Sequence, residues 1–470
     1  MSNKHFIITS IGWGAPLIHD TLDRVQHQSD LQFRHIVLTD VEALAVKNAS
    51  ERKDVYTIRN IKKDILPIPD LELLASLEAE GVPTIHNMIL GDRIVSRLPK
   101  TVALAYATLL ATRITSILRD IRPNVVIGAF DSMHAAMGLA VCRSLGIPWF
   151  ALSFTAIPTG FAGFCDGISP AKRIPILRHD LEALRAEAAS TLLQFEQKQI
   201  TTPVYVSAHS WKIIALRLPD HFKAYIRIAL DILFNKHDKF TTLNTSQVIA
   251  RYFARRKNTF TFPNQICLRQ PPDGRYALFA FHMQPESSID AWAPFFSNQL
   301  NVLEQIVRSM PPNLKLLVKI HISACDNYNS SQLKWILNLP NVEIIAPATS
   351  SRIFIEKSAL IFGIQGTICL EAALLGKPVL MFGDSPYLAF PSVSKIGRIT
   401  DLPKQILEVL KNTPPTRERI LNAYSNYLSY YHPMPFNDWK KKMTNNDIEN
   451  FTSIFNLMRK HLQTGQQLSK

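Results

Sequence analysis

The sequence predicts an α/β protein made of two Rossmann-like domains, with a helical segment between them and a helical C-terminal tail. Three observations support this fold class. Short apolar runs alternate with helical patterns in both halves of the chain, a strand–turn–helix–strand unit occupies residues 359–383, and polar side chains directly follow several of the apolar runs. With 470 residues the chain is too long for one hydrophobic core, so more than one domain is expected.

We predict four parts in chain order. They are an N-terminal Rossmann-like domain at 1–204, a basic helical linking segment at 205–274, a second Rossmann-like domain at 275–411 and C-terminal helices at 412–470. In the second domain we expect one long helix over 288–310 after its first strand. We expect the polar C-terminal helices to cross back to the first domain.

The composition narrows the class of protein. Lys and Arg number 52 against 38 Asp and Glu, a net charge of +14 that suits nucleic acid, an anionic membrane surface or a phosphorylated substrate. The five cysteines are scattered without a CxxC pair, and the histidines form no HExxH, so we expect reduced thiols, no metal site and a cytoplasmic protein. No run of about 20 apolar residues predicts a membrane span.

The unit at 359–383 carries the strongest binding signal. Ala359 to Phe362 reads as a buried strand, the glycine-containing turn ends at Gly366, and Thr367 is the expected N-cap of the next helix. Such a helix N-terminus suits a phosphate group. Glu371 lies one turn further on, placed to accept hydrogen bonds from a ribose diol. The alternative is a capped helix whose glutamate only favours the helix dipole.

Three loops of the second domain carry polar residues just after strands. They contain Gln284 and Glu286, then Lys319 and His321, then Gln365 with Gly366 and Thr367. Strand ends of one sheet converge, so these loops are expected to line one cleft. Each has a structural alternative: Glu286 as a helix cap, His321 as a satisfied core histidine, and Lys319 as a side chain extending from the strand edge.

In the first domain Asp131 is the candidate site residue. It directly follows the buried strand predicted at 125–129, at the end of the strand where ligands bind. Capping the following helix is the alternative, since Asp is a good N-cap. Residues 155–166 are also expected at this edge, which makes Asp166 the next candidate.

The linking segment mixes aromatic and basic residues from Trp211 to Lys257. One interpretation is a helix lying on anionic lipid. The other is an interdomain helical segment with a solvated basic face, since a run of charge is weak evidence by itself.

An ordered set of motifs resembles bacterial capsular polysaccharide biosynthesis proteins, including the capsule β-Kdo transferases. The set is Phe-His-Met-Gln-Pro-Glu286, then Pro-Pro-Asn-Leu-Lys-Leu-Leu-Val-Lys-Ile-His321, then Asn-Val-Glu-Ile-Ile-Ala-Pro347, then Gly-Thr-Ile-Cys-Leu-Glu-Ala372. The resemblance covers about residues 276 to 390, and the N-terminal half matches only in layout. Ile322 follows His321 where the family usually has proline, which leaves the sugar type open.

The resemblance implies a GT-B glycosyltransferase with two facing Rossmann-like domains. It places the Gln-Pro-Glu and His motifs in the active site and the Gly-Thr…Glu turn at the donor nucleotide. With the reasoning above, Asp131, Glu286 and His321 are the expected catalytic residues. The expected donor-binding residues are Gln284, Lys319, Gln365, Gly366, Thr367 and Glu371. No metal is expected, because a helix N-terminus and basic side chains can neutralise the leaving phosphate.

The implied reaction moves a sugar, Kdo or a related one, from a CMP- or UDP-linked donor to a surface-polysaccharide or glycolipid acceptor. The reaction needs no cofactor and is expected to take place in the cytoplasm. We expect peripheral contact with the inner membrane and no nucleic-acid partner. Two other classes stay open. One is a nucleotide-sugar epimerase or hydrolase on the same fold, and the other is a non-catalytic assembly component recruited to the membrane.

Overall fold

The computed structural model describes residues 6–12, 16–49, 54–128, 132–200, 238–284, 286–321, 324, 327–434 and 443–468. The chain divides into two compact units, and each is discontinuous in sequence. Unit 1 contains residues 1–181, 235–242 and 428–470, and unit 2 contains residues 182–234 and 243–427.

Unit 1 alternates strands and helices as far as β6. Its elements are β1 (Phe6–Ile11), α1 (Pro16–His27), β2 (Leu31–Thr39), α2 (Asp40–Ala49), β3 (Val55–Arg59), α3 (Leu71–Ser76), α4 (Ile85–Gly91), η1 (Val95–Arg97), α5 (Lys100–Ile121), β4 (Val125–Gly128), α6 (Met133–Ser144), β5 (Trp149–Phe154), β6 (Phe161–Asp166), β13 (His432–Pro433) and α18 (Asn445–Leu468).

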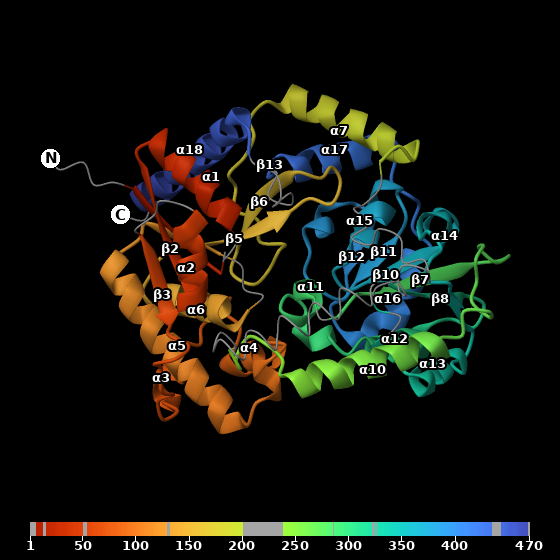
Figure 1. Cartoon of the computed structure of the whole chain (residues 1–470). Helices are drawn as coiled ribbons and strands as arrows, with labels where there is room; N and C mark the ends of the chain where they lie inside the picture. The colour runs from red at the N-terminus through yellow and green to blue at the C-terminus, as the bar shows by residue number, and fades with distance from the viewer. Residues whose placement is uncertain are drawn as a thin grey trace. The chain divides into compact units, whose positions relative to one another are not determined.

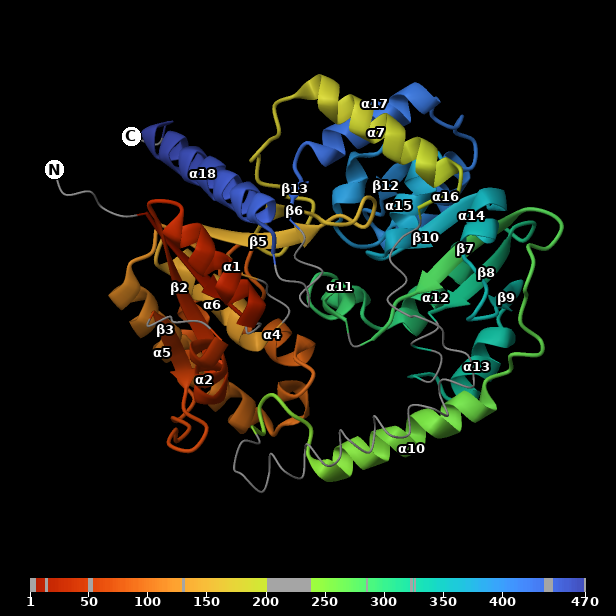
Figure 2. The ribbon, with the colours of Figure 1, turned by 45° about the horizontal axis from the view of Figure 1, so that its top comes forward.

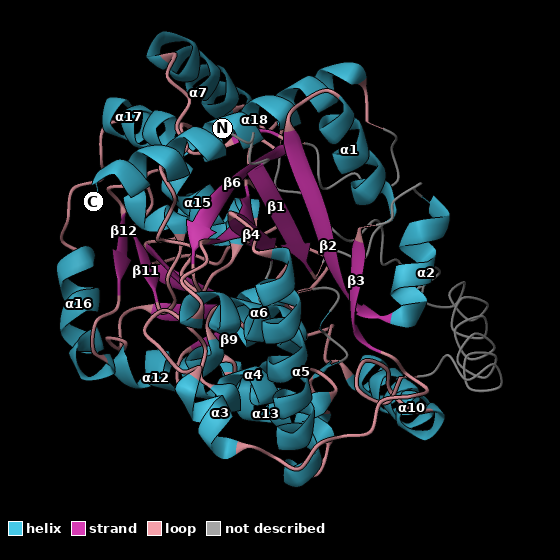
Figure 3. Cartoon of the chain, turned by 90° about the vertical axis from the view of Figure 1, so that its left-hand side faces the viewer, coloured by secondary structure: helices cyan, strands magenta, loops and turns pink. Residues whose placement is uncertain are grey.

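The sheet of unit 1 has the order β13-β6-β5-β4-β1-β2-β3. Figure 3 labels β6, β4, β1, β2 and β3 of this sheet. β1 to β5 are mutually parallel, while β6 and β13 are antiparallel to their neighbours. The chain runs from β1 outward to β3 and then returns to the other side of β1 with β4. The strand order therefore reverses between β1 and β4, which is where a sheet of this type binds ligands.

Helices cover both faces of this sheet. Ile8 and Phe33 belong to one hydrophobic cluster with residues of α1 and α18. Ile11 has the opposite parity along β1 and so points to the other face, where its side chain lies against Gly138 of α6. Figures 1 and 2 show α18 alongside α1, and Arg24 of α1 donates hydrogen bonds to Met443 O at 2.7 Å and Asn445 Oδ1 at 2.9 Å. The predicted return to the first domain is thus observed for α18, whereas almost all of α17 clusters with unit 2.

Helix α5 is, among the described residues, the single helix long and apolar enough to cross a membrane by length and composition. The sequence had predicted no apolar run of this length. Eleven of its residues, among them Leu110 and Ile114, are buried, and it packs on α3, α6 and β3. An apolar helix with about half of its residues buried is typical of the core of an α/β unit.

Unit 2 is a second alternating series. Its elements are α7 (Leu181–Glu196), α10 (Thr245–Thr261), β7 (Tyr276–Phe281), α11 (Ser287–Asp290), η2 (Pro294–Phe296), α12 (Gln299–Ser309), β8 (Lys315–Ile320), α13 (Ser330–Leu337), β9 (Val342–Ile345), α14 (Arg352–Lys357), β10 (Leu360–Gly363), α15 (Thr367–Leu374), β11 (Val379–Met381), η4 (Pro386–Ala389), β12 (Val393–Lys395), η5 (Ile399–Asp401), α16 (Leu402–Val409) and α17 (Arg417–Leu428).

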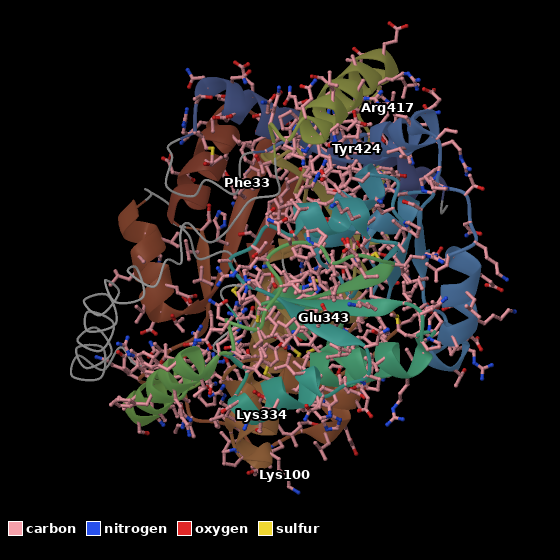
Figure 4. The ribbon with its side chains drawn as sticks, turned by 90° about the vertical axis from the view of Figure 1, so that its right-hand side faces the viewer. Phe33, Lys100, Lys334, Glu343, Arg417 and Tyr424 are labelled. Carbon is pink, nitrogen blue, oxygen red and sulfur yellow. The ribbon has the colours of Figure 1, made fainter. Side chains whose placement is uncertain are left out.

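The sheet of unit 2 is parallel throughout, in the order β12-β11-β10-β7-β8-β9. β7 is the first strand in sequence and lies between β8 and β10, so the order reverses between β7 and β10. An ion pair of 2.8 Å joins Lys315 of β8 to Glu343 of β9 at one side of the sheet, where Figure 4 labels Glu343. Both units therefore have the strand order of a Rossmann-like fold, which is the predicted fold class.

The long helix predicted over 288–310 is instead three short elements, α11, η2 and α12. Pro294 begins η2, and proline cannot continue a helix because it lacks the N–H and its ring clashes with the preceding turn. Helix α12 then restarts after Asn298, whose side chain accepts a hydrogen bond from Asn301 N at 3.2 Å.

The unit boundaries differ from the predicted domain boundaries at α7. Almost all of α7 clusters with unit 2, although it was expected in the N-terminal domain. Glu196 of α7 receives a two-pronged hydrogen bond from Arg417 of α17, with Nε–Oε1 at 3.1 Å and Nη2–Oε2 at 3.0 Å. Figures 1 and 2 show α7 beside α17, and Figure 4 labels Arg417 and Tyr424 on α17. Long-range ion pairs of this kind leave no local sequence pattern.

Candidate active site

The loops after β7 and β10 meet at the point where the strand order of unit 2 reverses. The backbone N–H of Gln365 donates to Nε2 of His282 at 3.4 Å. Gly366 lies against the same ring, because a Cβ on Gly366 would be 3.0 Å from His282 Cε1 and 3.3 Å from Nε2. Two of the three predicted loops therefore converge, and glycine at 366 allows the approach.

His282 is a neutral histidine. Burial, together with the nearby charge of His321, lowers the pKa of His282 to about 4. Since Nε2 accepts from the Gln365 N–H, the proton of the neutral ring resides on Nδ1. His282 belongs to the Phe-His-Met-Gln-Pro-Glu286 motif, but it is not among the predicted site residues.

His282 should make the folded protein sensitive to acid. Its folded pKa of about 4 lies below the ordinary value of 6.5, so between these values the unfolded chain binds a proton that the folded chain does not. The stabilisation is complete above pH 6.5 and is lost as the pH falls towards 4, by about 3 kcal/mol. His282→Gln keeps an acceptor near the position of Nε2 but does not titrate. Urea unfolding of both proteins across this range should show a flatter curve for the variant, and parallel curves would contradict the assignment.

Gln299, at the start of α12, holds the loop after β7 in place. Its buried amide accepts from His282 N at 2.6 Å and donates to His282 O at 3.2 Å and to Gln284 Oε1 at 2.8 Å. The amide nitrogen of Gln284 donates in turn to Asp290 Oδ1 at 2.9 Å and Ser297 O at 3.0 Å. Both protons of that nitrogen are used, so the side chain of Gln284, a predicted donor-binding group, is engaged in forming the loop.

Glu286 also belongs to this loop. Its backbone N–H donates to Asp290 Oδ2 at 2.9 Å, and its carbonyl accepts from Ile289 N at 3.2 Å and Asp290 N at 2.9 Å. Asn327, from the segment after β8, donates to Gln284 O at 2.7 Å. Glu286 is half-buried, and it belongs to a loop whose backbone is fixed by partners on two other elements.

The loop after β8 supplies Lys319 and His321. Lys319 is buried, and its ammonium donates to Ala346 O at 2.9 Å and Pro347 O at 2.6 Å, which ties β8 to the end of β9. The alternative of a lysine extending to solvent from the strand edge does not describe this side chain. His321 is half-buried and lies near enough to His282 to affect its pKa.

The turn after β10 differs from the prediction by one residue. The N-cap of α15 is Gly366, which offers no side-chain cap, and Thr367 is the first helical residue, with an exposed side chain. Thr367 was expected at the N-cap, but its hydroxyl is left outside the helix end. Glu371 is buried one turn on, and its charge adds to burial in raising the pKa of the Cys369 thiol to about 12.

Gln365 and Asp384 extend the site to the end of β11. The buried side chain of Gln365 donates to the carbonyl of Asp384, whose carboxylate forms an ion pair with Lys395 of β12. Gly383 is required beside them, because a Cβ there would be 2.7 Å from Ile364 O. Asp384 and Lys395 were not predicted, since neither lies in a recognisable motif.

In unit 1 the candidate Asp131 lies outside the described residues, between β4 and α6. The N-cap of α6 is the next residue, Ser132, and it makes no side-chain cap hydrogen bond. Asp92 instead accepts from Met133 N at 3.3 Å through Oδ2, and from Ile94 N and Val95 N at 2.9 Å through Oδ1. A carboxylate 41 residues earlier in the chain therefore supports the N-terminus of this helix.

Asp166 lies at the wrong end of the sheet to face an acceptor. It ends the antiparallel strand β6 and pairs with Phe150, near the start of β5. Asp166 is therefore at the amino edge of the parallel strands, where its carboxylate forms an ion pair with Arg143 of α6. The expectation that it lay at the ligand-binding edge was wrong, because the hairpin reverses the chain direction.

Within the described ranges, no group of three or more His, Cys, Asp or Glu side chains is arranged to hold a metal ion. The polar groups at the reversal point of unit 2 are a neutral histidine, a half-buried glutamate, a second histidine and the first turn of α15. This set suits binding of a phosphorylated ligand.

A family model for capsule polysaccharide biosynthesis proteins matches residues 170–418, more than half of the chain and all of the sheet of unit 2. The chain belongs to the capsule polysaccharide biosynthesis protein family. Membership of this family confirms the resemblance found in the sequence. On that basis the chain is a glycosyltransferase, and each of its two units has a Rossmann-like strand order. No curated protein matches it.

Solved structures similar to this family member have low identity to it. The β Kdo 2,7 transferase of Thermosulfurimonas dismutans KpsC is 11% identical with a TM-score of 0.33, over 74% of this chain and 89% of that one. The UDP-GlcNAc 2-epimerase of Methanocaldococcus jannaschii is 13% identical with a TM-score of 0.27, over 90% and 97%. Glycosyltransferase VinC in complex with dTDP is 10% identical with a TM-score of 0.28, over 97% and 99%. Likeness at this level identifies no substrate.

Proposed function

We propose that this protein transfers a sugar, Kdo or a related one, from a CMP- or UDP-linked donor to a surface-polysaccharide or glycolipid acceptor in the cytoplasm. The donor occupies the carboxyl edge of unit 2, where the strand order reverses. The transfer proceeds without a metal ion or cofactor. The observation that carries the proposal is the contact of Gln365 N–H with His282, which brings the loops after β7 and β10 together at that edge.

The chemistry of transfer assigns roles to the groups around this contact. Glycosyl transfer develops positive charge on the sugar and negative charge on the leaving phosphate. The N–H groups of the first turn of α15, at Gly366 and Thr367, suit the phosphate, with His321 as the basic side chain near His282. Lys319, bound to Ala346 O and Pro347 O, supports the site by holding the end of β8 against β9. Glu286 lies in the loop after β7, which contacts this turn through His282. Its carboxylate suits the cationic sugar carbon.

Nucleotide binding is the first test of the proposal. A ligand present at a hundred times its dissociation constant adds about 2.7 kcal/mol to stability, so CMP, UDP and their sugars should be ranked by thermal shift. The best donor is then incubated with and without a glycolipid acceptor, and with a chelator as a control for metal dependence. Conversion of the sugar without acceptor would indicate an epimerase or hydrolase. A protein that binds no nucleotide would be an assembly component.

Glu371→Ala should weaken donor binding by roughly 1.5–3 kcal/mol, the range for a hydrogen bond to a charged group. The proposed role of Glu371 is to accept hydrogen bonds from the ribose of a nucleotide held at the Gly366–Thr367 turn. Calorimetric titration with the donor nucleotide measures the change.

Because Glu371 is buried, the alanine variant is accompanied by Glu371→Gln, which preserves volume. Both variants are checked for an unchanged far-UV spectrum. Glu408→Ala, on the surface helix α16, serves as the matched control and should bind the donor normally. Unaltered donor affinity in folded Glu371→Ala and Glu371→Gln proteins would remove Glu371 from the donor site.

A further inference from the structure

Helix α10 turns its large apolar side chains outward. Ile249, Phe253 and Phe260 are 41%, 65% and 72% exposed, and their spacing of four and seven residues puts them on one face. Ala250 and Ala254, on the same side, are exposed as well. An ordinary surface helix has the opposite arrangement, with its apolar stripe against the core.

The opposite face of α10 carries two of its three arginines. Arg251 and Arg255 are half-buried together with Tyr252, and each of the three has an interaction partner. No described side chain of α10 is buried, so the helix has no core of its own. Its attachment comes after its C-terminus, where Leu268 exchanges backbone hydrogen bonds of 2.8 Å with Ile344 and Ala346 at the β9 edge. A helix that only linked two domains, with a solvated basic face, would not need outward phenylalanines.

The charge of α10 indicates which surface this face fits. Its sequence contains four basic residues and no acidic one, within a chain of net charge +14. Lys257 is exposed among the apolar residues, and the guanidinium of Arg256 lies over the ring of Phe260, 5.6 Å from its centroid. Basic groups beside outward aromatic residues match the headgroup region of an anionic bilayer, where aromatic side chains enter the interface and cations meet the lipid charge.

We propose that α10 docks this protein on an anionic lipid surface through Ile249, Phe253 and Phe260, flanked by Arg256 and Lys257. Docking through α10 determines where the protein binds and not which reaction it catalyses. It therefore holds or fails independently of the proposed donor and acceptor. It assigns the membrane contact to one helix face, whereas the sequence suggested only a broad basic segment whose first part, 205–237, lies outside the described residues.

The test is flotation of the full chain with vesicles of phosphatidylcholine, with and without phosphatidylglycerol, at low and high salt. Binding should require the anionic lipid and should weaken as salt rises. The double variant Phe253→Ser/Phe260→Ser should lose about tenfold in affinity for each phenylalanine. Arg256→Gln/Lys257→Gln should lose about fivefold for each charge.

Matched controls come from α16 of the same unit. Leu407→Ser removes an apolar side chain that is 49% exposed, and Lys411→Gln removes an exposed charge next to that helix. Both should float as the unmodified chain does, and all variants should transfer sugar to a soluble acceptor analogue at the normal rate. Binding that is absent, indifferent to lipid charge or unchanged in the α10 variants would overturn the proposal. A dimer in sedimentation that dissociates in Phe253→Ser/Phe260→Ser would also overturn it, by assigning the face to a second copy of the chain.

Discussion

Glu286→Gln is expected to lower turnover about a hundredfold or more at saturating donor. The substitution keeps the size of the side chain and removes its negative charge, which the transition state of glycosyl transfer needs beside the cationic sugar carbon. The backbone of Glu286 is held by Asp290 through hydrogen bonds of 2.9 Å that the substitution does not touch. The loop should therefore retain its conformation, and the measurement is the single-turnover rate with the preferred donor and acceptor.

The competing role for Glu286 is structural. Its carbonyl accepts the first hydrogen bonds of α11, so it occupies the cap position of that short helix. Glutamine serves there as well as glutamate does, and the structural role thus predicts normal turnover. Glu304→Gln is the matched control, since it removes a carboxylate of α12 that pairs with Arg308 at 2.6 Å on the surface. A folded Glu286→Gln protein as active as this control would leave His321 as the remaining catalytic candidate on unit 2.

Much of the fold follows from short-range patterns. β7 begins and ends where the apolar run predicts, because a strand buried on both faces must be apolar throughout. β9 also has the predicted bounds, although it is an edge strand and contains Glu343. The polar residues that follow β7, β8 and β10 could be assigned to one sheet edge for the same reason, since parallel strands end together. The observed contact of Gln365 with His282 is a consequence of that arrangement.

The features that were missed depend on contacts between distant residues. Gln299 is 17 residues from His282 and sits on a helix, so no local motif connects its amide to the loop that it holds. Asp92 reaches α6 from a different turn, and α7 joins unit 2 through Arg417. Asp166 was misplaced because the sequence does not reveal that β6 runs antiparallel. Direction of a strand is decided by pairing, not by composition.

Asp131→Asn is expected to lower turnover about a hundredfold or more while leaving the melting temperature unchanged. The residue follows β4 at the point where the strand order of unit 1 reverses, which is the ligand-binding edge of that sheet. A carboxylate there suits the acceptor hydroxyl, whose proton must be removed as the new bond forms. Turnover at saturating donor and acceptor measures the loss.

The structural alternative for Asp131 was the N-cap of α6, and that position belongs to Ser132. The helix end is instead served by the carboxylate of Asp92 at 3.3 Å from Met133 N. Asp92→Asn should therefore lower the melting temperature, because a hydrogen bond to a charged acceptor contributes about 1.5–3 kcal/mol. Ser132→Ala should change stability little, since its hydroxyl makes no cap bond.

These three variants separate a base from a cap. A base at Asp131 gives a folded, slow Asp131→Asn enzyme beside a less stable Asp92→Asn enzyme. If Asp131→Asn turns over normally, Asp166 cannot replace it, because Asp166 lies at the opposite edge of the sheet in an ion pair with Arg143. The acceptor-side carboxylate would then be sought at the carboxyl edge of β1 and β4, where Asp92 is already fixed by three backbone N–H groups. Loss of that carboxylate would reduce stability and turnover together, because it also supports the N-terminus of α6.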